Sequence, residues 1–244
     1  MTSSSNMQRQ QLVQTLFNRI AHRYDLLNRI ISFHCDVRWR EKTVKALSLK
    51  SSDRFVLDLG TGTGDLALTA AKRLGGEARI FGLDFSLEML RLAQAKKKDS
   101  YGDKIAYILG TALDPPFKDE AFDAVMTAFV LRNIPDLALF FRQAFRVLKP
   151  GGRLVSLDMF PPSSAPFSFL YALYFYRLVP WIGASLAHDR NAYQYLADSV
   201  RTFNPPEAVG NMIQQAGFVR VRIEKFLKGA VCLHVGEKPP ARVP

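Results

Sequence analysis

The residues best suited to chemistry begin at Asp58, in the stretch "FVLDLGTGTGDLAL". Three glycines at every second position, Gly60, Gly62 and Gly64, follow this acid at the end of a short apolar run. Glycines in such a turn let the backbone approach a small molecule closely. In open α/β sheets, a turn of this kind follows the first strand and binds a nucleotide cofactor. A second acid, Asp84, stands further along the chain, where a ribose-binding carboxylate is expected.

Two classes of cofactor compete for this turn. The segment from Gly62 to Ala67 also fits the G-x-G-x-x-G/A pattern of NAD-binding proteins. NAD would place its diphosphate at the helix N-terminus, beside Asp58 and Asp65. Each repulsion would cost about 3 kcal/mol at a distance of about 5 Å and an effective dielectric constant of about 20. S-adenosylmethionine carries a sulfonium, an ammonium and one carboxylate but no phosphate, so the acids favour it over NAD as the cofactor.

Other cofactor contacts are expected where the second and third strands end. The carboxylate of Asp84 is expected to accept hydrogen bonds from both ribose hydroxyls. The adenine is expected beside the following strand ends, where the candidates are Gly110, Thr111 and Ala112 near the ring, Phe85 and Leu109 flanking it, and Asp114 at its amine.

Composition sets the broad class of the protein. The chain has 244 residues, of which 48% are hydrophobic and 23% are charged, which is enough for one large core. The formal net charge of +11 favours contact with nucleic acid, an anionic membrane surface or acidic ligands, or serves solubility alone. The two cysteines and four histidines show no metal-ligand spacing, so no metal site is predicted. We expect neither a secretory signal nor a spanning helix, and a cytoplasmic location.

The elements that must position these residues are visible in the hydrophobic pattern. Short apolar strands alternate with helices of about ten residues, which predicts a parallel, doubly wound α/β sheet. Serine at position 86 is a candidate N-cap for the helix that follows it. The predicted strands are 55–59, 78–83, 105–109, 122–127 and 153–159, and the predicted helices between them are 65–74, 87–98 and 137–147.

Both ends of the chain depart from this alternation. Residues 7–50 are predicted to be helical, with an apolar stripe at spacings of three and four that comprises Leu12, Leu16, Ile20, Tyr24 and Leu27. After the fifth strand an aromatic-rich helical segment precedes a helix at 206–216 and two antiparallel strands at 219–224 and 230–236. We predict one domain over 1–244, comprising a helical cap (1–50), a cofactor-binding half (53–160) and a substrate-side section (161–244).

Four groups of segments carry a resemblance to a known family. They are "FNRIAHRYDLLNRIISFHCDVRWR"; "VLDLGTGTGDL" with "LDFSLEML"; "AFVLRNIPD" with "RVLKPGGRL"; and "YQYLADSVRTFNPPE" with "AGF" and "GAVCLHVGEK". The glycine turn and "LKPGG" are shared by many methyltransferases, whereas the terminal segments and "LRN" are more specific and occur in the expected order. From Phe17 to Lys238 the chain resembles the UbiE/MenG family of quinone-biosynthesis C-methyltransferases.

The resemblance implies a Rossmann-like class I methyltransferase with a mostly parallel seven-stranded sheet, helices on both faces and an N-terminal helical cap. It implies methyl transfer from S-adenosylmethionine to a ring carbon of a polyprenylated quinol in menaquinone or ubiquinone synthesis. The family's cofactor contacts map onto Thr63, Asp84 and the pair Thr111–Ala112. The predicted cofactor-binding residues are Asp58, Gly60, Gly62, Thr63, Gly64, Asp84, Phe85, Thr111, Ala112 and Ala128.

The chain departs from the family's pattern at two of these positions and at one position outside them. Thr111 stands where the family usually has Asn or Asp, so we expect a weaker contact with the adenine. Ala128 cannot supply the hydroxyl of the family's serine. His188 replaces an asparagine and places a titratable group near the expected substrate mouth.

The predicted catalytic residues are Arg132, Asn133 and Tyr24. A phenol loses its proton near pH 10, so an unaided site at pH 7 would lose about 4 kcal/mol. Arg132 is expected to stabilise the phenolate and Asn133 to orient it. Tyr24 and its neighbour Asp25 lie in the segment expected to cover the site and are candidates for proton transfer. Alone, Arg132 fits a surface ion pair, but its place in the family segment "LRN" favours a catalytic role. Tyr24 also fits the apolar stripe of a packed helix.

The acceptor's prenyl tail needs an apolar surface. Residues 167–181, with Leu26, Ile30 and Phe33, are expected to line its entrance, which together with the positive charge suggests a peripheral contact with the inner face of the membrane. An aromatic helix packed on the sheet fits the same pattern. The oligomeric state is left open, with a homodimer as one expectation. Alternative functions are methylation of another small molecule and nucleic-acid binding, although the chain lacks a basic stripe interleaved with aromatics.

Overall fold

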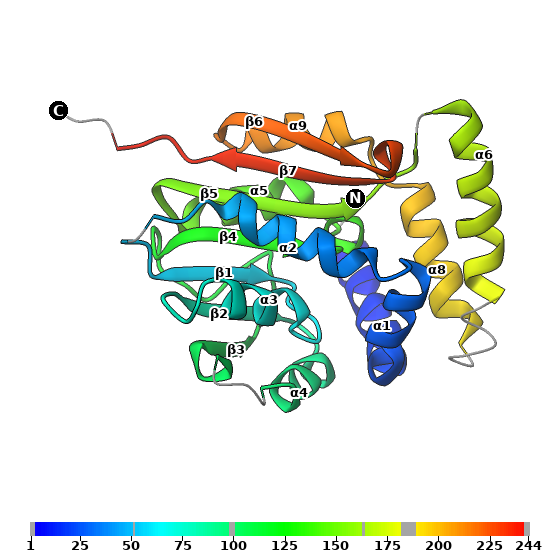
Figure 1. Cartoon of the computed structure of the whole chain (residues 1–244), viewed down its shortest axis with the longest axis horizontal. Coiled ribbons are helices and arrows are strands. Elements are labelled where there is room, and N and C mark those ends of the chain that lie inside the picture. The colour runs from blue at the N-terminus through cyan, green and yellow to red at the C-terminus, as the bar shows by residue number, and fades with distance from the viewer. Residues whose placement is uncertain (1–2, 51, 98–100, 163, 182–188, 242–244) are drawn as a thin grey trace.

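The structure is a computed structural model that describes residues 3–50, 52–97, 101–162, 164–181 and 189–241. A seven-stranded sheet lies at its centre (Figure 1). In chain order the strands are β1 (Phe55–Leu59), β2 (Arg79–Asp84), β3 (Ile105–Leu109), β4 (Phe122–Ala128), β5 (Leu148–Met159), β6 (Val219–Phe226) and β7 (Val231–Glu237).

The strand order is β3-β2-β1-β4-β5-β7-β6. Strands β1 to β5 run parallel, and β7 lies antiparallel between β5 and β6. The chain builds outward from β1 to β3 and then returns to place β4 on the other side of β1. The carboxyl ends of β1 and β4 therefore meet at the switch point, where open α/β sheets bind their ligands.

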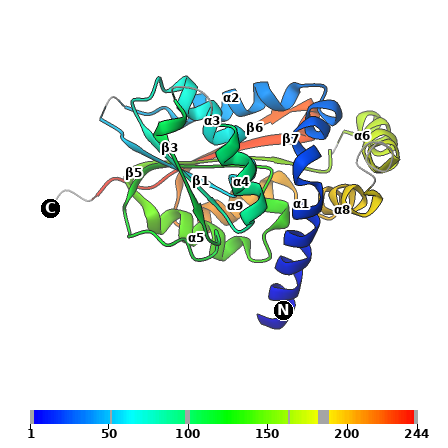
Figure 2. The same cartoon turned by 90° about the horizontal axis from the view of Figure 1, so that it is seen from below.

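Helices cover both faces of the sheet, as predicted (Figure 2). On one face α2 and α3 pack against the inner strands through a cluster that includes Trp39 and Met126. On the other face α5 and α9 form a second cluster that includes Phe140 and Ile213. These four helices are α2 (Cys35–Leu47), α3 (Asp65–Arg73), α5 (Leu137–Val147) and α9 (Pro206–Gln215). A fifth helix, α4 (Leu87–Ala95), packs against the edge strand β3.

Three further helices lie beyond the carboxyl ends of the parallel strands (Figures 1 and 2). They are α1 (Ser3–Ile31), α6 (Ala165–Leu173), which continues as a π-helical turn at Tyr174–Leu178, and α8 (Arg190–Arg201). Their apolar faces form a third cluster, which contains Leu16, Ile20 and Leu27 of the predicted stripe. Tyr24 packs at the edge of this cluster, and the side chain of Leu12 lies outside the described residues.

One predicted strand boundary was wrong for an identifiable reason. Strand β5 begins at Leu148 rather than at residue 153, because Lys149–Gly152 pairs with the C-terminal chain through hydrogen bonds from Gly151 N to the Lys238 carbonyl and from Lys238 N to the Gly152 carbonyl. Helix α4 ends at Ala95, whereas the pattern predicted a helix to residue 98. Within the described residues, no helix is long and apolar enough to cross a membrane.

Candidate functional site

The glycine loop between β1 and α3 needs glycine for two reasons. Gly60, Gly62 and Gly64 all have positive φ, at 73°, 57° and 82°. A Cβ on Gly60 would lie 2.6 Å from a methyl of Val130, and one on Gly64 would lie 2.2 Å from the hydroxyl of Tyr107. Any side chain at either position would force a neighbour to move. The loop therefore brings bare backbone to the wall of a pocket at the switch point.

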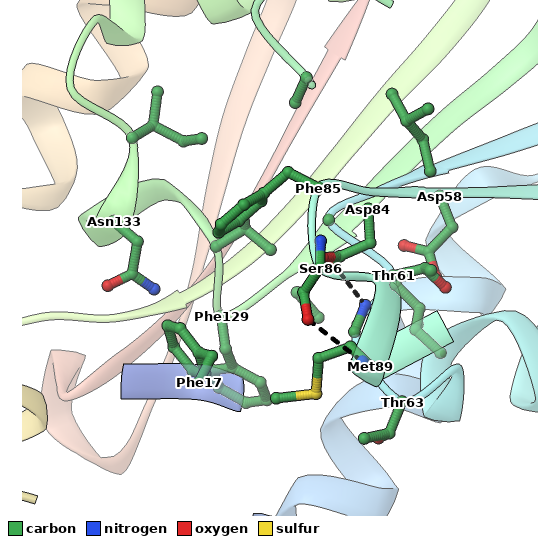
Figure 3. Close-up of a pocket in the computed structure, with 18 of the residues that line it drawn as sticks. Phe17, Asp58, Thr61, Thr63, Asp84, Phe85, Ser86, Met89, Phe129 and Asn133 are labelled. Atoms are coloured by element: carbon green, nitrogen blue, oxygen red, sulfur yellow. Dashed lines mark hydrogen bonds between the residues drawn. The ribbon is translucent and has the colours of Figure 1, made fainter. Parts of the chain in front are cut away.

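Asp84 ends β2 on the same side of the sheet. Its carboxylate accepts hydrogen bonds from the backbone N–H groups of Gly62 (2.8 Å) and Ser86 (2.9 Å). Ser86 caps α4, as predicted, by accepting from the Met89 N–H at 3.1 Å. Burial raises the pKa of Asp84, although the backbone hydrogen bonds oppose that shift. The second acid thus stands at a fixed place in the pocket, beside the glycine loop (Figure 3).

Asp58, at the end of β1, is almost completely buried in this pocket. Its Oδ2 accepts a hydrogen bond from the Thr61 hydroxyl at 2.7 Å, whereas its Oδ1 has no hydrogen-bond partner in the structure. Burial raises the pKa of Asp58 to about 7. A cationic ligand group beside Oδ1 would offset this cost of burial, so the geometry suits a positively charged ligand.

Asp65 does not act as the sequence suggested. Its carboxylate forms ion pairs with Arg29 and Lys96, both at 2.8 Å. Burial alone would raise the pKa of Asp65, but Arg40 and Lys96 hold it below its ordinary value. Because its charge is compensated by these cations, Asp65 would not repel a diphosphate. The electrostatic case against NAD therefore rests on Asp58 and not on Asp65.

Nine of the ten predicted cofactor-binding residues line the pocket; Gly64 does not and serves the turn alone. Leu109 is exposed and, like Asp114, lies away from the pocket, so the structure does not support either as an adenine contact. The lining residues that the sequence analysis did not predict include Phe17, Arg40, Ser86, Met89 and Phe129. Arg40 lies in "RWR", and Ser86 and Met89 lie in "LDFSLEML", which are among the segments of the resemblance. Several of these residues surround the pocket in Figure 3.

Helix α1 closes the pocket from outside the sheet. The Thr63 hydroxyl donates to Asp25 at 2.6 Å, and Lys96 also pairs with Asp25. The Ser86 hydroxyl donates to the side-chain oxygen of Asn18 at 2.6 Å. Asp25 is thus engaged at the glycine loop and lines neither the pocket nor the cavity beside it. Its predicted part in proton transfer has no support in this geometry.

A second cavity of about 370 Å³ adjoins the first and is lined mainly by apolar side chains; we call it the aromatic cavity. Tyr24 and Phe129 line both the pocket and the aromatic cavity, so these two residues mark the boundary. The other principal lining residues are Phe33, Trp39, Arg132, Met159, Phe167, Leu170, Tyr171, Tyr174, Phe175 and Leu227.

Phe129 is held in an unusual conformation at this boundary. Its φ is +63°, in the left-handed region, and its N–H donates to the Leu157 carbonyl at 2.8 Å. The guanidinium of Arg40 lies 5.4 Å from the ring centroid and that of Arg132 lies 6.0 Å from it. Strained non-glycine residues cluster at functional sites. The surrounding structure therefore holds the Phe129 ring at the boundary between the cofactor pocket and the aromatic cavity.

The structure brings the three predicted catalytic residues together. Tyr24, Arg132 and Asn133 line one small cavity between α1 and α8. Arg132 is buried and donates to Asp158 at 2.7 Å and to the Phe129 carbonyl at 2.8 Å, so it is not in a surface ion pair. Burial alone would lower the pKa of Arg132, but Asp158 holds it above the ordinary value.

The two neighbours of Arg132 differ in what they can do. Asn133 lines the cofactor pocket, and its side-chain oxygen accepts from the Tyr195 hydroxyl at 3.2 Å. Burial raises the pKa of Tyr24, although the charges of Arg132 and Arg40 oppose that shift. Tyr24 therefore keeps its proton at neutral pH and can donate a hydrogen bond but not act as a base. His188 lies outside the described residues.

Comparison with known proteins is decisive at this point. The sequence model of the ubiE/COQ5 methyltransferase family matches residues 3–238. The chain belongs to this family. A demethylmenaquinone methyltransferase from Thermus thermophilus is 43% identical to it over 92% of this chain and 100% of the relative. Another from Lactiplantibacillus plantarum is 40% identical over 93% of this chain and 95% of the relative.

Solved structures agree with the fold. A Thermotoga maritima structure described as an S-adenosylmethionine-dependent methyltransferase, possibly acting on histamine, superposes with a TM-score of 0.63. It covers 93% of this chain and 99% of its own at 20% identity, so it speaks to the fold alone. With the family established, the chain is a class I methyltransferase that uses S-adenosylmethionine in quinone biosynthesis.

The pocket fits this cofactor by its chemistry. The unpartnered Oδ1 of Asp58 suits a positive charge, and the carboxylate of Asp84 suits hydroxyl donors. Phe85, Met89 and Ala112 supply apolar surface for a flat ring. The positive charge, the ribose hydroxyls and the adenine ring of S-adenosylmethionine thus have suitable counterparts in the pocket.

Proposed function

We propose that the chain transfers the methyl group of S-adenosylmethionine to a ring carbon of demethylmenaquinol, in preference to a methoxy-benzoquinol. One observation carries the proposal: the cofactor pocket meets the aromatic cavity at Tyr24 and Phe129. A flat aromatic ring with a prenyl tail matches a space lined by aromatic and aliphatic side chains. The names of the relatives favour the naphthoquinol over the benzoquinol as acceptor.

The reaction forms one C–C bond, breaks the S–CH3 bond of the cofactor and one ring C–H bond, and releases one proton in total. The cofactor supplies an electrophilic methyl group. The acceptor ring becomes nucleophilic when a neighbouring hydroxyl is deprotonated. After methyl transfer the ring carbon loses its own hydrogen as a proton, and the oxygen regains one, so the net release is a single proton. The products are the methylated quinol, S-adenosylhomocysteine and a proton. This sequence of events needs a positive charge beside the developing phenolate.

Arg132 supplies that charge in the proposed mechanism. Its guanidinium lines the aromatic cavity next to the boundary with the cofactor pocket and is charged at every working pH. Stabilising the phenolate offsets the roughly 4 kcal/mol that separates a phenol pKa near 10 from pH 7. Tyr24 donates a hydrogen bond to the same oxygen, and Asn133 orients the ring from the pocket side.

The cavity also contributes by excluding water. Its lining is almost wholly apolar, and water there would compete for the guanidinium and weaken its interaction with the phenolate. Methyl transfer is an in-line displacement, so holding the ring carbon against the boundary supplies part of the rate by orientation alone. The fixed ring of Phe129 provides a surface against which the acceptor ring can stack.

The proposal extends to peripheral contact with a membrane at the open end of the aromatic cavity. Phe33, Leu170 and Leu227 line the cavity and are also exposed to solvent, so its entrance lies in an apolar surface. A lipid bilayer that holds the prenylated quinol would meet this surface. A homodimer stays a separate prediction, which sedimentation equilibrium would check. Further large apolar side chains are exposed on α1 and on residues 165–181: Leu26, Ile30, Phe169, Leu173, Leu178 and Trp181.

The proposed function is tested by turnover on two acceptors. Purified protein is given S-adenosylmethionine with reduced demethylmenaquinone or with the reduced polyprenyl methoxy-benzoquinone, each in matched micelles. We expect methylated product from the naphthoquinol, with a kcat/KM well above that for the benzoquinol. The reverse preference would move the chain to ubiquinone synthesis, and cofactor binding without methylation of either quinol would refute the acceptor class.

A further inference from the structure

The cofactor pocket contains one positive charge whose purpose the family assignment leaves open. Among the described residues that line the pocket, Arg40 is the only basic side chain. The same lining holds the carboxylates of Asp58, Asp65 and Asp84. S-adenosylmethionine carries two positive groups and one carboxylate. We propose that Arg40 binds the carboxylate of the cofactor's methionine moiety, an inference that rests on S-adenosylmethionine being the cofactor.

The guanidinium of Arg40 is fixed in place before any ligand arrives. Arg40 lies on α2 and is 6% exposed. It donates through Nη1 to Asp36, which is itself buried, and stands over the ring of Phe129 at 5.4 Å. Its Nη2 lies 4.0 Å from Asp65, beyond hydrogen-bond distance. The described hydrogen bonds of Arg40 therefore use one nitrogen of a group that carries five N–H donors.

The charge of Arg40 is only partly compensated by its neighbours. Asp36 accepts from both Arg29 and Arg40, so one carboxylate serves two guanidinium groups. Asp65 is paired at shorter range with Arg29 and Lys96. A buried cation without a full complement of acceptors is costly, and a ligand carboxylate would remove that cost. Arginine is the side chain whose planar fork best matches a carboxylate.

The position of Arg40 agrees with the polarity of the cofactor. Asp84 marks the ribose end of the pocket, whereas Arg40 shares the boundary region with Tyr24 and Phe129. The methionine moiety extends from the ribose through the sulfonium, so its carboxylate lies on the far side of the reacting methyl group from the adenine. Arg40 thus binds the carboxylate, the one group of the cofactor that the acids Asp58 and Asp84 cannot bind.

The test compares two ligands that differ only in this carboxylate. Isothermal titration measures binding of S-adenosylmethionine and of decarboxylated S-adenosylmethionine, which keeps the sulfonium and the ammonium. For the wild type we expect the decarboxylated ligand to bind on the order of tenfold to a hundredfold more weakly, the range for a hydrogen bond between charged groups. In Arg40→Met the discrimination should fall to about threefold or less. Arg40→Gln should behave in the same way and serves if Arg40→Met fails to fold.

The matched control is Arg29→Met. It removes a guanidinium that pairs with the same two carboxylates, Asp36 and Asp65, but Arg29 does not line the pocket. This variant should keep the wild-type discrimination. The proposal is overturned if the Arg40 variants keep the wild-type ratio, even with weaker binding overall, or if Arg29→Met loses it equally. Binding of neither ligand to the wild type would refute the cofactor itself.

Discussion

The cofactor pocket and the aromatic cavity touch, yet they are built in opposite ways. The pocket takes most of its polar groups from the ends of β1 to β4 and the loops that follow them. Its key carboxylates, Asp58 and Asp84, are held by hydrogen bonds to nearby groups. The cavity is assembled from α1, α2, α6, α8, the segment after β4, the end of β5 and the start of β7, which are far apart in sequence. Polar hydrogen bonds position the first site, whereas packing of aromatic side chains shapes the second.

This difference separates binding from turnover. Changes in the pocket should act on cofactor affinity, because its charged groups contact the cofactor. Changes in the cavity should act on the acceptor, and leave cofactor affinity alone. Arg132 stands where the two meet, buried against Asp158. The predictions below test whether the two regions are separable, from the largest expected effect to the smallest.

Arg132→Ala should have the largest effect. Without the guanidinium the developing phenolate loses its counter-charge, and kcat should fall on the order of a hundredfold to a thousandfold. The dissociation constant of S-adenosylmethionine should change by no more than about threefold, because Arg132 lies outside the lining of the cofactor pocket. Steady-state turnover and isothermal titration measure the two quantities.

A control variant separates the loss of catalysis in Arg132→Ala from a loss of stability. Arg132→Ala leaves the buried carboxylate of Asp158 without its cation, which destabilises the fold. The double variant Arg132→Met with Asp158→Asn removes both charges and should stay folded but equally inactive. Wild-type turnover in either form would exclude Arg132 from the mechanism.

Asp84→Asn should weaken cofactor binding on the order of tenfold to a hundredfold, because the amide is a poorer acceptor for the ribose hydroxyls and for the N–H groups of Gly62 and Ser86. At saturating cofactor, kcat should stay within a few fold of wild type. Asp114→Asn is the matched control, since Asp114 lies away from the pocket and should leave affinity unchanged. An unaltered dissociation constant in Asp84→Asn would contradict the assigned ribose contact.

Cofactor affinity should rise with pH through the titration of Asp58. Burial raises its pKa to about 7, so below this pH the carboxylate is largely protonated and unable to attract a cation. Affinity should increase about tenfold from pH 6 to pH 8 and then level off. In Asp58→Asn this dependence should vanish, and a profile as steep as that of wild type would point to another titrating group.

The same shift has a consequence for the cofactor-free protein. The folded state binds more protons at Asp58 than the unfolded state does between about pH 4 and pH 7, so the free energy of unfolding should fall as the pH rises through this window. Denaturant unfolding of wild type and Asp58→Asn at several pH values would measure the difference.

Leu170→Glu should have the smallest effect, confined to the acceptor. Leu170 lines the aromatic cavity at its exposed edge, and a charge there should raise KM for a prenylated quinol in micelles about threefold to tenfold. Cofactor affinity should not change. Phe169→Glu is the control, because Phe169 is similarly exposed on the same helix but does not line the cavity. Equal effects of the two changes would show that membrane or micelle contact, not the cavity, is being measured.

The contrast between the regions also explains what the sequence could predict. The pocket could be predicted from the sequence because its signals are local: an acid, alternating glycines and a second acid at the end of the next strand. The strands of the sheet could be predicted for the same reason, since the alternation of strands and helices is a short-range pattern. The division of the chain into a cap, a cofactor half and a substrate-side section stays a prediction.

The detailed lining of the aromatic cavity could not be predicted from the sequence, because it depends on which distant segments pack together. The ion pairs of Asp65 with Arg29 and Lys96 connect α3 with α1 and with the end of α4, and no spacing in the sequence predicts them. They reversed the expected role of Asp65. Likewise the positive φ of Phe129 is imposed by its surroundings and has no local signature. Asp25, expected near the acceptor, instead holds the glycine loop.

The central claim is that a prenylated quinol ring enters the aromatic cavity and meets the cofactor at Tyr24 and Phe129. The most direct measurement is transfer of a labelled methyl group from S-adenosylmethionine to demethylmenaquinols with no tail, one prenyl unit, two units and longer tails. The account predicts a ring-methylated product and a kcat/KM that rises over the first prenyl units, as the tail fills the cavity, and then levels off. Equal kcat/KM for the tailless and prenylated acceptors would contradict it.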